Sequence, residues 1–320
     1  MTTDFPEPNY IETNGIRLAL HEQGDGETVV LCHGFPELAY SWRHQLPALA
    51  AAGYHAIAPD QRGYGASDKP TAVEAYDIRQ LTSDMTGLLD ALGLERAWFV
   101  GHDWGALVVW QLALLAPERL HGVVAVNIPF HARPPADPIE TMRATLGPDF
   151  YIVEFQDSDE ADRRFAAEPE RFLRSMMRRL PVTREAFEQI PAEKRRPFSM
   201  LRTMDEPLRG DDLLPDDELA VFTAAFRSGG FTGPINWYRN WSRNWELTEG
   251  VEQRVRVPAL FIGARDDVLV APRHIEAMKN HVEDLEVHMV RDCGHWTQQE
   301  KPEEFNAVLI DWLGRRRAQR

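Results

Sequence analysis

Cysteine, positive charge and long apolar runs are all scarce in this chain of 320 residues. The two cysteines, Cys32 and Cys293, lie far apart and lack metal-ligand spacing, so neither a disulfide framework nor a zinc site is indicated. Lysine and arginine total 35 against 50 aspartates and glutamates, and the net charge of -15 disfavours nucleic acid and anionic membranes as partners. The chain has no run of about eighteen apolar residues, and Met1–Pro6 lacks the pattern of an export signal. We therefore expect a soluble, cytoplasmic protein.

Short apolar segments alternate with helical sequence through most of the chain. The first two, Tyr10–Glu12 and Ile16–Leu20, are joined by Asn14-Gly15, a dipeptide typical of β-hairpins. Uninterrupted apolar strands are then predicted at Val29–Cys32, His55–Ala58, Trp98–Val100, Val123–Val126, Ala259–Ile262 and Leu285–Val290. Such strands, separated by helices, indicate an α/β protein with a mostly parallel central sheet covered on both faces.

The strand signal disappears between about Pro129 and Glu246, where the sequence is charged and helical in pattern. We interpret this segment as an inserted helical lid, or cap. The prediction therefore divides the chain into a first part of the core at 1–130, a lid at 131–246 and a second part of the core at 247–320.

An aspartate lies at the centre of the pentapeptide Gly101-His102-Asp103-Trp104-Gly105. The apolar run Ala97–Val100 precedes it and a helical segment, Ala106–Ala116, follows, which is the context of the G-x-nucleophile-x-G turn. Aspartate is also a common helix N-cap, but the two glycines favour a strained turn that presents a reactive residue. A carboxylate in this place is suited to attack saturated carbon and to form an alkyl ester.

Hydrolysis of that ester requires a base and a group that orients the base, in the chain order nucleophile, acid, histidine. His295 follows the strand that ends at Val290, and two adjacent aspartates follow the strand that ends at Ile262. Both places are carboxyl ends of parallel strands, where open α/β sheets bind their ligands. We assign His295 as the base and Asp266 as its partner, with Asp267 as the alternative because spacing does not distinguish adjacent residues.

The segment His33-Gly34-Phe35-Pro36-Glu37 follows the strand that ends at Cys32. This is where the fold builds half of an oxyanion hole. We expect the backbone N–H groups of Phe35 and Trp104 to hold the Asp103 carboxyl and then the tetrahedral anion formed from its ester.

Five segments together resemble the α/β-hydrolase-fold epoxide hydrolases, and in particular the hydrolase domain of the soluble epoxide hydrolases. They are His33–Pro36, Asp60–Asp68, Gly101–Gly105, Asn236–Asn240 and Gly294–Gln298. The similarity extends from about Tyr10 to Leu313 and includes the lid.

This resemblance implies two lid tyrosines, Tyr151 and Tyr238, whose hydroxyls hold and protonate the epoxide oxygen. A phenol with a pKa of about 10 stays protonated at neutral pH and can serve as this acid. The implied product is a vicinal diol, the implied reactants are a small epoxide and water, and no metal or organic cofactor is needed. Trp237, Phe130 and Phe155 suggest an apolar substrate pocket, and the protein is expected to be a monomer or a homodimer.

Two other functions compete with this one. A haloalkane or haloacid dehalogenase uses the same ester, but a halide needs N–H donors, and Phe35 has no side-chain amide to add to Trp104. A non-catalytic receptor for a small molecule is the alternative of a different class. Tyr238 also has a purely structural interpretation, because tryptophans 237, 241 and 245 are spaced by four, as on one helical face.

Overall fold

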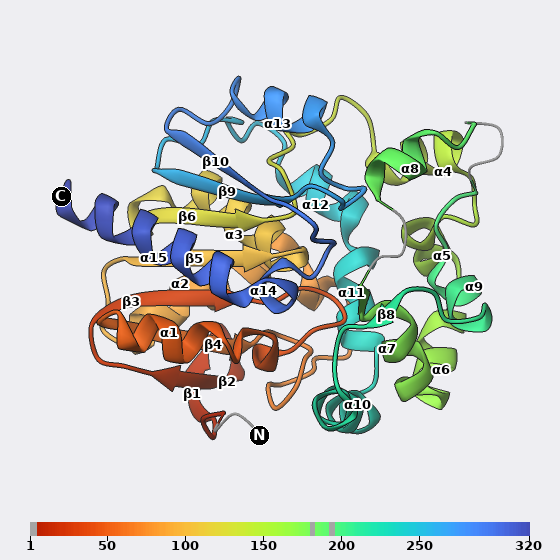
Figure 1. Ribbon diagram of the computed structural model, residues 1–320, viewed down its shortest axis with the longest axis horizontal. Coiled ribbons are helices and arrows are strands. Elements are labelled where there is room, and N and C mark those ends of the chain that lie inside the picture. Colours follow the sequence, from red (N-terminus) through yellow and green to blue (C-terminus); the bar gives the residue numbers. More distant parts are fainter. Residues whose placement is uncertain (1–4, 180–182, 192–195) are drawn as a thin grey trace.

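The computed structural model describes residues 5–179, 183–191 and 196–320. Its main sheet has eight strands in the order β1-β2-β4-β3-β5-β6-β9-β10 (Figure 1). The strands are β1 (Asn9–Thr13), β2 (Ile16–Gln23), β3 (Glu27–Cys32), β4 (Tyr54–Asp60), β5 (Ala97–His102), β6 (Leu120–Val126), β9 (Ala259–Ala264) and β10 (Leu285–Val290).

The pairing of these strands confirms the predicted hairpin and the mostly parallel sheet. β1 and β2 pair antiparallel from Asn9 opposite Leu20 to Thr13 opposite Ile16. β2 also pairs antiparallel with β4, and the pairs from β4 through β3, β5, β6 and β9 to β10 are all parallel. The carboxyl ends of these parallel strands therefore gather at one edge of the sheet.

Helices cover both faces of the sheet, as Figure 1 shows. The helices of the core are α1 (Gln45–Ala51), α2 (Ile78–Ala91), α3 (Trp104–Leu115), α13 (Pro272–Met278), α14 (Thr297–Glu300) and α15 (Pro302–Ala318), with short 3₁₀ turns at Ala39–Trp42, Val73–Tyr76 and Pro117–Arg119. On one face, the fully buried Trp312 of α15 lies 5.4 Å from Trp98 of β5 between ring centroids. Burying an apolar side chain of ordinary size contributes about 1.5–3 kcal/mol, so this packing holds α15 firmly on the sheet.

The chain between β6 and β9 forms helices beside one end of the sheet (Figure 1), and we refer to residues 131–246 as the lid segment. Its described helices are α4 (Pro138–Leu146), α5 (Tyr151–Asp157), α6 (Glu160–Ala167), α7 (Pro169–Met176), α8 (Arg184–Glu188), α9 (Met200–Asp205), α10 (Asp216–Gly229), α11 (Thr232–Arg239) and α12 (Trp241–Leu247), the last of which ends one residue beyond the segment. The sequence did not predict the two-residue strands β7 (Arg178–Arg179) and β8 (Asp211–Asp212), which pair antiparallel within it. Ion pairing explains why so polar a ribbon forms, since Arg178 binds Asp212 across it.

The predicted boundaries at residues 130 and 246 stay predictions. Within the described part of the chain, no helix is both long enough and apolar enough to cross a membrane.

Candidate active site

Asp103 occupies a strained turn between β5 and α3. Its backbone angles are φ 50° and ψ -119°, outside the conformations that side chains ordinarily favour. The turn is closed so tightly that a Cβ on Gly101 would lie 2.2 Å from the carbonyl oxygen of Gly105, and one on Gly105 would lie 2.0 Å from that of Cys32. Glycine is therefore required on both sides, and the strain projects the Asp103 carboxylate beyond the edge of the sheet.

The segment after β3 reaches this carboxylate closely enough to hold it. The Phe35 N–H donates to Asp103 Oδ1 at 2.9 Å. A Cβ on Gly34 would lie 2.4 Å from the Asp103 Cβ, so only glycine allows this approach. The geometry agrees with Phe35 as an oxyanion donor, whereas the same role for Trp104 stays a prediction.

His295 lies between two carboxylates. Its Nε2 is 3.5 Å from Asp103 Oδ2, and its Nδ1 is 2.7 Å from Asp267 Oδ2. Burial alone would lower the pKa of His295, but the two carboxylates outweigh burial and raise that pKa well above its usual value. The free site therefore favours an imidazolium held by two negative charges.

The preference for Asp266 as the partner of His295 is wrong, because the structure places the alternative, Asp267, in contact with the imidazole. Asp267 is 1% exposed, and its other oxygen accepts the Leu269 N–H at 2.9 Å. Asp266 is only half-buried, and its backbone N–H donates to the Cys293 carbonyl at 3.2 Å. The turn after β9 thus buries the second aspartate and leaves the first one near the surface.

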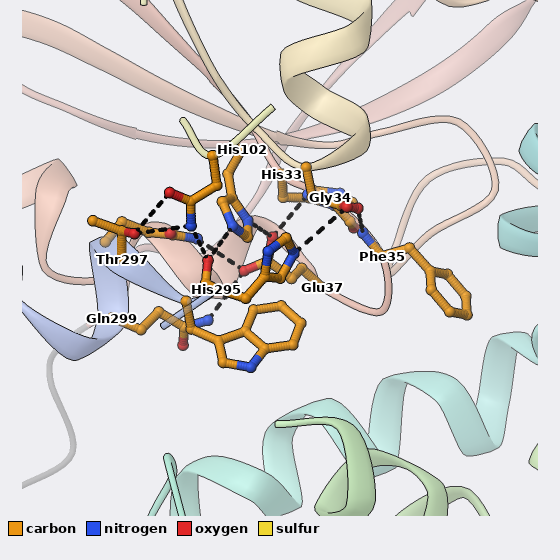
Figure 2. A network of polar contacts seen from close by, with 12 residues as sticks. His33, Gly34, Phe35, Glu37, His102, His295, Thr297 and Gln299 are labelled. Carbon is orange, nitrogen blue, oxygen red and sulfur yellow. Dashed lines mark hydrogen bonds and ion pairs between the residues drawn. The ribbon is translucent and has the colours of Figure 1, made fainter. Parts of the chain in front are cut away.

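A buried contact between a carboxyl group and an imidazole behind His295 was not predicted. Glu37 Oε2 lies 2.6 Å from His102 Nδ1, and both side chains are fully buried (Figure 2). His102 Nε2 lies 2.7 Å from the backbone oxygen of His295, while the Gly34 N–H donates to Glu37 at 2.8 Å. Burial alone would raise the pKa of Glu37, but His102 and this N–H outweigh it and lower the pKa to about 2. The pair therefore joins the loop that holds the carboxylate to the loop that carries the base.

Asn127, also missed by the sequence analysis, fixes the same loop from the next strand. It follows β6 directly, with φ 61°, and is fully buried. Its Nδ2 donates to the His295 carbonyl and to Thr297 Oγ1, the latter at 2.9 Å, while its Oδ1 accepts the Ala264 N–H at 2.9 Å. Its only signal in the sequence is a polar residue at the end of an apolar strand.

The two lid tyrosines contact each other, and one of them contacts residues next to Asp103. Tyr151 begins α5 and Tyr238 lies in α11, and their ring centroids are 5.7 Å apart. Tyr238 also contacts Phe35 at 5.4 Å and Trp104 at 5.0 Å between centroids. Burial, reinforced by the Asp103 charge, raises the pKa of both phenols, so both stay protonated and can donate.

The three predicted pocket residues differ in their surroundings. The Phe155 ring lies 5.2 Å from that of Tyr238, and Trp237 lies 5.7 Å from Trp104. Phe130 instead packs on two rings outside this group, those of Trp110 at 5.6 Å and His281 at 5.7 Å. The structure therefore brings the first two into contact with candidate site residues, whereas the contacts of Phe130 indicate core packing.

Among the described residues, no group of three or more histidine, cysteine, aspartate or glutamate side chains is arranged to hold a metal ion. The site instead combines a carboxylate, an imidazolium and two neutral phenols. This set can attack a carbon, hydrogen-bond to a leaving oxygen and activate water.

The chain matches a family model described as alpha/beta hydrolase fold over residues 27–302. It is 42% identical over 315 residues to epoxide hydrolase A of Mycobacterium tuberculosis (strain ATCC 25618 / H37Rv), covering 96% of this chain and 97% of the relative. It is 38% identical to bifunctional epoxide hydrolase 2 of Sus scrofa, covering 93% of this chain and 53% of the relative, so it spans about half of that protein. The crystal structure of epoxide hydrolase A from Mycobacterium thermoresistibile matches with a TM-score of 0.88 and 45% identity, covering 96% of this chain and 98% of that one.

Proposed function

Because the chain belongs to the epoxide hydrolases of the α/β-hydrolase fold, we propose that it adds water to a small epoxide to give a vicinal diol, through an ester on Asp103. The resemblance drawn from the sequence motifs is thereby confirmed. The observation that carries the proposal is the placement of the Asp103 carboxylate, which lies 3.5 Å from His295 Nε2 and accepts the Phe35 N–H, while the Tyr238 ring packs on Phe35 and on Trp104, the residue after Asp103.

In the first step, the Asp103 carboxylate attacks one carbon of the epoxide. The ring C–O bond breaks, and the oxygen takes its electron pair and a proton from Tyr151 or Tyr238. A hydroxyalkyl ester and a phenolate result. Two neutral phenols suit this step, because a ring oxygen that would otherwise leave as an alkoxide needs an acid beside it.

The ester changes the charge around His295. In the free enzyme, the negative charge of Asp103 helps to hold the pKa of His295 high. Formation of the ester removes this charge. The imidazolium can then return a proton to the phenolate and become a neutral base. In the second step, His295 takes a proton from water, and the resulting hydroxide attacks the carbonyl carbon of the Asp103 ester. The C–O bond to the diol then breaks, the leaving oxygen takes the hydroxyl proton of the tetrahedral intermediate, and the diol is released as the carboxylate returns. Asp267 accepts from Nδ1 and keeps Nε2 directed at this water.

The dehalogenase alternative receives less support from the same geometry. The indole N–H of Trp237 donates to the Arg62 carbonyl at 3.1 Å and is therefore occupied. Phe35 contributes no side-chain N–H beside the Trp104 indole. The phenols, in contrast, match an oxygen leaving group. A non-catalytic receptor would have no need for the contact between Asp103, His295 and Asp267.

The aromatic surroundings favour an apolar epoxide, bound against Phe155 and Trp237. A cytoplasmic location, predicted from composition, and a monomeric or homodimeric state are also part of the proposal.

Turnover in heavy-oxygen water tests the ester route. With enzyme in excess and a single turnover of styrene oxide, the diol should carry no heavy oxygen, and the peptide that contains Asp103 should gain it. Heavy oxygen in the diol of the first turnover, with an unlabelled peptide, would show direct attack by water. Asp103→Asn is the control and should form no ester with any epoxide. Matched alkyl halides, assayed alongside, test the rival function.

A further inference from the structure

Arg239 connects the two helices that carry the lid tyrosines. It is the last residue of α11 and directly follows Tyr238. Its guanidinium donates to the carbonyls of Phe155 and Ser158 at the C-terminal end of α5, at 3.1 and 3.2 Å. It also forms a bidentate pair with Asp162 of α6, at 3.0 and 2.6 Å. Because the last carbonyls of a helix lack partners within it, a cation at this place stabilises the end of α5.

Gln156 makes a second connection between the same helices. Its Nε2 donates to the Tyr238 carbonyl at 2.9 Å and to the Ile152 carbonyl at 2.9 Å. α5 has only seven residues and begins at Tyr151. A helix is a stiff link with a fixed rise per residue, so holding its C-terminal end also holds Tyr151 at its first turn.

We propose, on the basis of the proposed function, that Arg239 is a positioning residue that sets the separation of the Tyr151 and Tyr238 hydroxyls. Gln156 supports it in this role. The rings of the tyrosines meet at an interplanar angle of 74° and 5.7 Å between centroids. Both hydroxyls must reach one small oxygen at the same moment, and a displacement of about 1 Å can cost about 100-fold in rate.

Burial and placement set the Arg239–Asp162 pair apart from the ion pair that Arg143 forms with α5. The side chains of Arg239 and Asp162 are 16% and 9% exposed. Arg143 of α4 also forms a bidentate pair with α5, binding Asp157 at 2.6 and 2.9 Å, but those side chains are 34% and 50% exposed. That pair does not involve α11, so Arg143 provides a matched control on the same helix.

The two half-reactions separate a positioning role from a structural one. Ester formation uses the phenols, whereas ester hydrolysis depends on His295. With styrene oxide as the probe, Arg239→Gln should slow ester formation at least about 10-fold and change ester hydrolysis by less than about twofold. Arg143→Gln should change either rate by less than about twofold. Equal slowing of both steps in Arg239→Gln, or no slowing of either, overturns the proposal.

Non-additivity gives a second readout. If Arg239 acts through Tyr151, then Arg239→Gln should slow ester formation by less than about twofold once Tyr151→Phe is present. If Arg239→Gln slows ester formation as much in the Tyr151→Phe variant as it does in the wild type, the proposal is contradicted. If Arg239→Gln does not fold, Gln156→Leu replaces it in the same cycle, with the same expectations.

The proposed function can fail separately from the role of Arg239. A wild-type protein that forms no ester with any epoxide overturns both. Wild-type turnover that requires Tyr151, together with unchanged ester formation in Arg239→Gln, overturns only the role of Arg239.

Discussion

Replacing Asp267 by asparagine should stop the reaction after the ester has formed. Asp267 is buried and accepts from His295 Nδ1 at 2.7 Å, so the substitution removes a charge-assisted hydrogen bond. Such a bond contributes about 1.5–3 kcal/mol, equivalent to roughly 10- to 150-fold in rate. An asparagine amide can also present its N–H to the imidazole and favour the wrong tautomer, which costs more. We therefore expect ester hydrolysis to slow at least about 100-fold.

Intact-protein mass spectrometry provides the assay. Opening the ring expels no group, so the ester adds the whole mass of the epoxide to the protein. Asp267→Asn should accumulate this adduct during turnover, because ester formation depends less on the partner of His295 than hydrolysis does. Asp266→Asn is the control and should turn over within about threefold of wild type, since its side chain lies outside this contact. Accumulation in Asp266→Asn, with none in Asp267→Asn, would refute the assignment from the structure.

Three further predictions concern the surroundings of the site. Glu37→Gln should lower the free energy of unfolding near pH 7 by about 3 kcal/mol, because the pKa of Glu37 falls from 4.5 to about 2 on folding. This contribution is present above pH 4.5 and lost as the pH falls toward 2, so urea unfolding of wild type and variant should converge in acid; a constant difference would contradict the linkage. Gly34→Ala should reduce ester formation at least about 100-fold, because the new Cβ would lie 2.4 Å from the Asp103 Cβ, and single-turnover kinetics check this. Trp312→Ala should destabilise the protein by about 3–5 kcal/mol with the kcat of the remaining folded enzyme unchanged, and a smaller loss in urea unfolding would contradict the packing argument.

The strands of the core could be predicted because parallel strands buried on both faces must be apolar along their whole length. The same regularity located Asp103 and His295, since the carboxyl ends of such strands gather at one edge. It could not distinguish Asp266 from Asp267. Which of two adjacent side chains a turn buries depends on the neighbouring Cys293–His295 segment, and spacing carries no information about that contact.

Residues that act through tertiary contacts were missed for a related reason. Glu37 lies 65 positions from His102, and Asn127 lies 168 positions from the His295 carbonyl that it binds. A single polar residue after a strand forms no sequence pattern from which such a distant contact could be predicted. Phe130 shows the converse, because its aromatic side chain suggested a pocket, whereas the fold packs it on Trp110.

The unequal contacts of His295 agree with the order of the proposed reaction. The closer carboxylate, Asp267 at 2.7 Å, is buried and forms no covalent bond in either step. The more distant one, Asp103 at 3.5 Å, must leave the imidazolium to attack carbon, and its charge disappears in the ester. A short, fully desolvated bond to Asp103 would stabilise the resting carboxylate and raise the barrier to its attack, because only interactions stronger in the transition state accelerate a reaction. The strong bond is made to Asp267, which does not react. His295 can therefore be an acid beside the free Asp103 carboxylate and a base beside the Asp103 ester.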